Sequence, residues 1–116
     1  MKVYILGTKY NIEYKTDEEV AKEMLVEAGE CGGYCNPYNN SIVISVLNKC
    51  ADGTEAKKNL IKRNLRHEII HAFLHESGLH ENSEAVNAWA TSEEIVDWIA
   101  LQFPKILKAF NTAGAI

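Results

Sequence analysis

The sequence of 116 residues predicts a single α+β domain, with a small antiparallel or mixed sheet packed on a long helix and a C-terminal helix. Three observations indicate this class. Short runs of β-branched and aromatic residues, typical of strands, lie in the first half of the chain. Two longer segments with apolar residues at helical spacing lie in the second half. Glycine, proline and asparagine separate these runs, and no internal repeat or linker divides the chain.

The composition and charge argue against several classes of protein. With 47% hydrophobic and 24% charged residues, the chain is typical of a globular protein. The net charge is -4, and the basic residues from Lys57 to Arg66 are expected to form the solvated face of a helix, so no nucleic-acid partner is predicted. No signal peptide follows Met1, and no window approaches the length of a membrane span. We therefore expect a cytoplasmic protein that does not bind membranes.

The three cysteines, Cys31, Cys35 and Cys50, are expected to be reduced thiols in or near loops. An odd number in a chain without a secretion signal argues against a disulfide framework. Cys31 and Cys35 could instead join Cys50 and a histidine in a structural zinc site. That alternative is weaker, because structural sites usually show two close pairs of ligands and the chain has no second pair.

Three strands are predicted in the first half of the chain. Lys2 to Leu6 and Tyr10 to Tyr14 are expected to form a hairpin around Gly7-Thr8-Lys9. Cys31 to Asn40, with its glycines and asparagines, is predicted to be a loop. Ser41 to Leu47 is nearly all apolar and β-branched, as in a buried strand, and we expect it to expose an edge with which an extended peptide could pair.

Capping residues mark the starts of the predicted helices. Thr16 is the expected N-cap of the first helix, where Glu19 completes a capping box, and Gly29 is the expected end of that helix. A second capping-box candidate, Asp52-Gly53-Thr54-Glu55, opens a long helix that extends to about Ser77.

The long helix changes character along its length. One side is basic in the first half and apolar in the second half, where it carries Ile69, Ile70, Phe73 and Leu74. We therefore expect the first half to be exposed on that side and the second half to be buried nearly all round. Gly78 is the expected stop.

The last helix follows a polar connection from Leu79 to Ala90, which could hold a short helix of its own. Thr91 is the predicted N-cap, with Glu94 closing a third capping box. Pro104 is expected to kink or restart the helix. Its apolar stripe consists of Ile95, Val96, Ile99, Ala100 and Phe103.

The long helix contains His67-Glu68-Ile69-Ile70-His71, an H-E-x-x-H motif typical of the zinc-binding helix of metallopeptidases. Residues four apart lie on one face of a helix, so His67 and His71 can bind one tetrahedral ion. Glu68 lies close enough to act as the general base on a metal-bound water. A catalytic site also needs a third protein ligand and an open position.

The candidates for the third ligand are His75, His80, Glu93, Glu94 and Asp97. His75 lies one turn too far along a straight helix, so we expect it at the mouth of the cleft or, in preference, exposed. His80 could fold back, although nothing in the spacing requires it. Glu94 already has a role in the predicted capping box. Glu93 and Asp97 share one helix face at the edge of the apolar stripe, so the sequence favours Glu93.

With these residues the chain resembles the gluzincin branch of the zincin metallopeptidases, whose H-E-x-x-H is followed on a later helix by E-x-x-x-D. The residues that carry the resemblance are His67, Glu68, His71, Glu93 and Asp97. It implies a zincin-like fold, Zn2+ held by His67, His71 and Glu93, and Asp97 as an outer-shell acceptor that orients a ligating histidine. Over residues 65–74 and 93–100 the chain is also similar to small zincin-like proteins of bacterial and prophage genomes, relatives of the ImmA/IrrE peptidases.

The residues and the resemblance together predict one zincin-like metallopeptidase domain over residues 1–116. The expected activity is zinc-dependent hydrolysis of a protein or peptide, with Glu68 as general base. A phage-type repressor is the substrate that the resemblance suggests. The alternative is a zincin-fold binding module that retains the metal but has little or no activity. A third reading is a small structural protein whose histidines are core residues.

Overall fold

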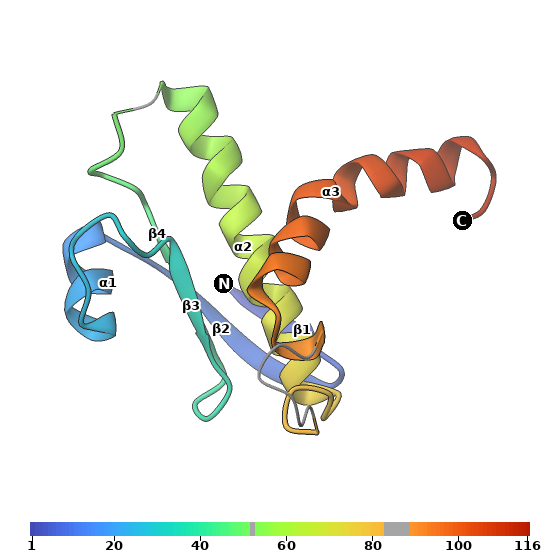
Figure 1. Ribbon diagram of the computed structural model, residues 1–116, viewed down its shortest axis with the longest axis horizontal. Helices are drawn as coiled ribbons and strands as arrows, with labels where there is room; N and C mark the ends of the chain where they lie inside the picture. Colours follow the sequence, from blue (N-terminus) through green and yellow to red (C-terminus); the bar gives the residue numbers. More distant parts are fainter. Residues whose placement is uncertain (52, 83–88) are drawn as a thin grey trace.

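The structure, a computed structural model, describes residues 1–51, 53–82 and 89–116. Over these residues the chain is α+β, as predicted, with a four-stranded sheet and three α-helices (Figure 1). No helix among them has the length and hydropathy needed to cross a membrane. The strands are β1 (Lys2–Ile5), β2 (Thr8–Lys15), β3 (Gly33–Asn36) and β4 (Ser41–Ser45). The helices are α1 (Asp17–Met24), α2 (Thr54–Glu76), the 3-10 helix η1 (Trp89–Thr91) and α3 (Glu93–Thr112).

The sheet is mixed, with strand order β1-β2-β4-β3. The pairs β1–β2 and β3–β4 are antiparallel, whereas β2 and β4 are parallel, with Ile12 opposite Ile42. The interior position of β4 explains its apolar sequence, because Ile42, Val43 and Ile44 are all buried. The free edge expected for this strand is wrong, since β3 covers it.

β3 lies within the segment predicted to be a loop, so that prediction is wrong for Gly33–Asn36. Pairing with the buried strand β4 provides partners for the backbone of this segment, and this tertiary contact outweighs its low β-propensity. The close approach depends on Gly33, where an added Cβ would lie 2.5 Å from the carbonyl oxygen of Val43. β3 is therefore an edge strand of the sheet.

The N-terminal hairpin is confirmed, but its turn differs from the prediction. β1 ends at Ile5 and β2 begins at Thr8, so the turn is Leu6-Gly7 and not Gly7-Thr8-Lys9. Both turn residues have positive φ angles, 47° and 88°. Such two-residue turns match the twist of antiparallel strands, and glycine adopts this backbone conformation without strain.

Helix α1 begins as predicted and ends earlier. The hydroxyl of Thr16 accepts a hydrogen bond from the backbone N–H of Glu19, and the Glu19 carboxylate accepts one from the backbone of Thr16. The helix ends at Met24 and not at Gly29, because Leu25 adopts the left-handed conformation with a φ of 57°. Leu25 and Val26 are both exposed, so no burial stabilises a further turn.

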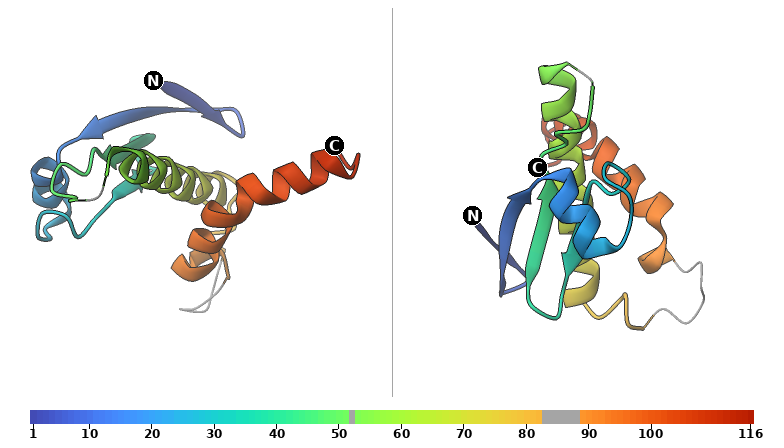
Figure 2. Two further views of the ribbon diagram at one scale, coloured as in Figure 1. Left: turned by 90° about the horizontal axis from the view of Figure 1, so that it is seen from above. Right: turned by 90° about the vertical axis from the view of Figure 1, so that its left-hand side faces the viewer.

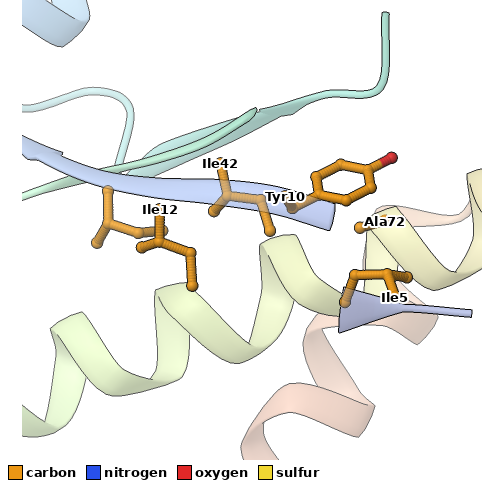
Figure 3. Packing of buried hydrophobic residues seen from close by; sticks show 6 residues of the cluster. Ile5, Tyr10, Ile12, Ile42 and Ala72 are labelled. Carbon is orange, nitrogen blue, oxygen red and sulfur yellow. The ribbon is translucent and has the colours of Figure 1, made fainter. Parts of the chain in front are cut away.

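The main hydrophobic core lies between the sheet and α2 (Figure 3). Ile5 of β1, Tyr10 and Ile12 of β2, and Ile42 of β4 fill this space, with Ala72 of α2 buried among them. Complete burial of one large apolar side chain contributes about 1.5–3 kcal/mol. This packing holds the helix with the H-E-x-x-H motif against the sheet.

Helix α2 ends within one residue of its predicted end, but its start is capped differently. The N-cap is Gly53, which makes no side-chain capping bond, so the predicted box with Asp52 as its cap is wrong. Asp52 itself lies outside the described residues. The second half is not buried all round, because Phe73 is 42% exposed. Within α2 the buried residues are Glu68 and Ala72.

Helix α3 begins one residue later than predicted. Ser92, and not Thr91, is the N-cap, and its hydroxyl accepts a hydrogen bond of 3.4 Å from the backbone N–H of Ile95. The predicted third capping box is therefore wrong. Glu94 has no place in the cap and is exposed.

The middle of α3 contains Pro104, and the helix bends along its course, as a proline in a helix predicts (Figure 1). Its C-terminal half projects away from the sheet (Figure 2). Of the predicted apolar stripe, Val96 and Ala100 are buried, whereas Phe103 is exposed. Half of the predicted connection from Leu79 to Ala90, residues 83–88, lies outside the described residues.

Candidate metal centre

Three side chains from two helices bring their ligand atoms together at the first turn of α3. On α2, the Nε2 atoms of His67 and His71 lie 3.1 Å apart. Glu93, the first residue of α3, places Oε2 2.9 Å from Nε2 of His67 and Oε1 2.9 Å from Nε2 of His71. The structure thus brings together the three residues that were predicted as ligands, although they come from separate parts of the chain.

These separations suit a divalent metal ion. Zinc binds histidine nitrogen at about 2.0–2.1 Å, so the ligand atoms of a tetrahedral site lie about 3.3 Å apart. Burial lowers the pKa of His71, although the Glu93 carboxylate opposes this effect. A lowered pKa favours the neutral imidazole, which is the form that binds metals. The side chain of Glu93 is 72% exposed, so the group is accessible from solvent.

A hydrogen bond from α2 holds α3 in position beside the histidines. The Nε of Arg66 donates a hydrogen bond of 2.6 Å to the carbonyl oxygen of Ala100. This contact corrects the prediction that Arg66 belongs to a solvated face. Because Glu93 and Ala100 are seven residues apart, they lie on the same side of α3. The hydrogen bond beside His67 therefore positions the face that presents Glu93.

Asp97 lies on this same face of α3. Its Oδ1 is 3.4 Å from Nδ1 of His67, on the opposite side of the imidazole from Glu93. That distance is longer than an ordinary N–H···O hydrogen bond, which spans 2.7–3.2 Å. The carboxylate therefore lies beside the imidazole without an ordinary hydrogen bond to it.

Glu68 is buried beside the three ligand candidates. It is 8% exposed and lines the same cavity as His67, His71 and Glu93. Burial raises the pKa of its carboxyl group to about 7; His67 opposes the increase and Glu93 adds to it. A carboxyl group with such a pKa can gain and lose a proton near neutral pH, as a general acid-base catalyst must.

The cavity, with a volume of about 310 Å³, also receives residues that were not predicted as part of a site. β3 contributes Gly33, Tyr34 and Cys35 to its wall. A strand of four residues carries too little periodicity for sequence reasoning to find it, and only the position next to β4 brings it to α2. Burial raises the pKa of Cys35 to about 12, with Glu68 adding to the increase, so the thiol stays neutral.

Two further histidines line the cavity. His75 was expected to be exposed in preference to lining the mouth of a cleft; it is half-buried in the wall, so exposure is wrong. Its ring stacks on that of His80, with the centroids 3.8 Å apart. Burial lowers the pKa of His75, and His80 lowers it further. His80 groups with His75 and Glu81 and not with Glu93, so it is not the third ligand of the first group.

In the part of the chain that the structure describes, no cysteine belongs to either group of side chains that could hold a metal ion. The alternative structural zinc site of Cys31, Cys35 and Cys50 is therefore not formed there.

Comparisons with models of protein families, with curated proteins and with solved structures find no match for this chain.

Proposed function

We propose that the chain is a zinc-dependent metallopeptidase with a zincin-like fold, in which His67, His71 and Glu93 hold the metal ion. The observation that carries the proposal is the meeting of three side chains in the cavity that also contains the buried Glu68. The two histidine Nε2 atoms lie 3.1 Å apart, and each lies 2.9 Å from a different carboxylate oxygen of Glu93. Two imidazoles and a carboxylate form a ligand set that suits zinc. The cluster places a candidate general base next to a group of side chains that can bind a metal ion. Metal-assisted hydrolysis requires both.

When bound, zinc supplies a Lewis acid and a water molecule whose pKa is close to neutral. Glu68 takes the proton from the attacking water and later gives it to the nitrogen of the leaving amine, so that one proton is moved and none is consumed. Its pKa of about 7 in the metal-free protein suits both transfers, and a nearby cation favours the ionised form that begins the reaction.

The edge strand β3 is the proposed binding site for an extended substrate. Tyr34 and Cys35 lie both on this strand and in the wall of the cavity, so a peptide paired with β3 would pass beside Glu68. Main-chain hydrogen bonds to an exposed strand edge bind peptides without requiring a particular sequence. By resemblance, a phage-type repressor is the first substrate to test.

Replacement of the proposed base tests the reaction. Glu68→Gln should retain stoichiometric zinc and lose at least about 100-fold in the rate of peptide hydrolysis, because general-base catalysis contributes that much or more. Glu94→Gln, which removes an exposed carboxylate on the first turn of α3, is the matched control and should keep both zinc and activity. A fully active Glu68→Gln variant would exclude this mechanism.

Removal of the third ligand tests the metal site independently of activity. Glu93→Ala should weaken zinc binding by more than about 100-fold, since loss of even an outer-shell partner costs 10- to 100-fold. Glu94→Ala should leave zinc affinity unchanged. If Glu93→Ala binds zinc as tightly as the wild-type chain, the gluzincin-type ligand set is wrong.

A binding module that retains the metal is the second candidate, and one observation favours it. Trp98 and Leu101, three residues apart on one face of α3, are both exposed, and Trp98 is 56% exposed. Aromatic and aliphatic residues of this kind are typical of protein-binding surfaces. Incubation of the zinc-loaded chain with candidate repressors separates the two functions, because a peptidase produces fragments whereas a binding module forms a complex with an intact partner.

A further inference from the structure

We infer a second divalent-metal site, formed by His75, His80 and Glu81, at the C-terminal end of α2. It is separate from the group of His67, His71 and Glu93 and does not depend on the proposed peptidase activity. The ligand atoms of the three side chains lie within 4.8 Å of one another.

The end of α2 determines how these side chains meet. Gly78 adopts a left-handed conformation with a φ of 81°, which turns the chain back on the helix. The backbone N–H of His80 then donates a hydrogen bond of 3.1 Å to the carbonyl oxygen of Leu74. This return places the His80 ring on that of His75, with the centroids 3.8 Å apart, and leaves Glu81 beside them.

The polar atoms of this group are not satisfied by one another. Nδ1 of His80 is buried and has no hydrogen-bond partner among the residues that the structure describes. Oε1 of Glu81 lies 3.8 Å from Nδ1 of His75, which is too far for a hydrogen bond. A buried nitrogen without a partner is costly, and a metal cation is a partner to which its lone pair can be donated. Binding of a metal ion therefore accounts for a cluster that internal hydrogen bonds do not.

The chemistry of the group selects the class of ion. Two imidazoles and one carboxylate favour zinc, cobalt or nickel over magnesium or calcium. A tetrahedral site needs ligand atoms about 3.3 Å apart, whereas Oε1 of Glu81 lies 3.8 Å from Nδ1 of His75, so this pair must close by about 0.5 Å. Glu81 can supply part of that movement because its side chain is 67% exposed. The second site is therefore weaker than the group at Glu93, where the histidine nitrogens and the nearest carboxylate oxygens are already 2.9–3.1 Å apart.

His75 and His80 line the same cavity as His67 and His71, so an ion bound by the second group would lie in its wall. The second site is thus next to the path of any ligand that reaches the first. Occupancy of the second site would also join the end of α2 to the turn that carries His80 and Glu81.

Metal titration of the full chain tests the inference. Metal-free wild-type protein should bind two equivalents of Co2+ or Zn2+ by calorimetry, the second at least about tenfold more weakly than the first. His80→Ala and Glu81→Gln should each lose the weaker equivalent and keep the tighter one. Glu94→Gln is the matched control for Glu81→Gln, and circular dichroism should show that every variant is folded.

The outcomes distinguish this site from the first one. Glu93→Ala should lose the tighter equivalent and retain the weaker one. If the wild-type chain binds a single equivalent that Glu81→Gln and His80→Ala abolish, the second site stands and the proposed peptidase centre fails. If both of these variants bind metal as the wild-type chain does, the second site is overturned, whatever the result for Glu93→Ala.

Discussion

The burial of Glu68 should make the metal-free protein lose stability as the pH rises. The pKa of this carboxyl group is about 7 in the folded chain, compared with an ordinary value of 4.5. Between these values the folded state binds more protons than the unfolded state, so the free energy of unfolding falls with increasing pH. Ionisation of Glu68 in its buried position is the physical cause.

The size of the effect follows from the two pKa values. A difference of about 2.5 pH units, from 4.5 to about 7, corresponds to about 3 kcal/mol at 1.36 kcal/mol per unit. The neutral amide in Glu68→Gln cannot ionise, so the variant does not lose this stability. Its advantage over the wild-type chain should therefore grow by about 2–3 kcal/mol between about pH 5 and about pH 8.

Urea unfolding in the presence of a chelator, measured at both pH values, provides the comparison. Glu94→Gln removes an exposed carboxylate on α3 and serves as the control, because burial does not affect that side chain. Addition of zinc should reduce the pH dependence of the wild-type chain, since a nearby cation stabilises the ionised carboxylate.

One result would refute this reasoning. If the stabilities of the wild-type chain and of Glu68→Gln change in parallel with pH in the chelator, Glu68 is ionised at little cost. The carboxylate would then be hydrated, and the cavity around it would not be the desolvated site that its proposed role as a base requires.

Three other changes give separate tests. Asp97→Asn should weaken zinc binding by about 10- to 100-fold in a competition assay, because it removes the carboxylate 3.4 Å from Nδ1 of His67; unchanged affinity would show that this carboxylate does not support the ligand. Arg66→Met keeps the apolar stem of the side chain but loses the hydrogen bond to Ala100, so urea unfolding should show a loss of about 1–3 kcal/mol, with weaker zinc binding. Wild-type stability would show that this hydrogen bond does not hold α3. Hydrogen bonds from two hydroxyl groups of β2 lower the pKa of Glu76. The contribution of Glu76 to stability is therefore present above its ordinary pKa of 4.5 and is lost as the pH falls through the lower pKa of the folded state. Glu76→Gln should reduce the loss of stability in acid, and an unchanged acid transition would contradict this assignment.

Local signals were sufficient for several parts of the fold. The box of Thr16 and Glu19 predicted the start of α1, because an N-cap depends on neighbouring residues alone. The end of α2 followed in the same way from Gly78. The starts of the other helices were displaced because adjacent residues, such as Thr91 and Ser92, can both act as caps, and the local sequence does not distinguish them.

Contacts between distant segments were beyond such reasoning. β3 is short and has weak β-propensity, and it is a strand because β4 offers it backbone partners. The cavity wall formed by Tyr34 and Cys35 follows from that pairing. His75 is half-buried, and not exposed, because the chain turns at Gly78 and places His80 on it.

The sequence by itself determined which chemical groups share a helix face, since His67 and His71, and likewise Glu93 and Asp97, are four residues apart and helical geometry is local. The spacing could favour Glu93 over other candidates but could not place it. Only the tertiary structure decided that Glu93 lies 2.9 Å from Nε2 of His67 and of His71, because that distance depends on how α3 crosses α2. The crossing is set by packing and by the hydrogen bond between Arg66 and α3, which join segments far apart in the chain.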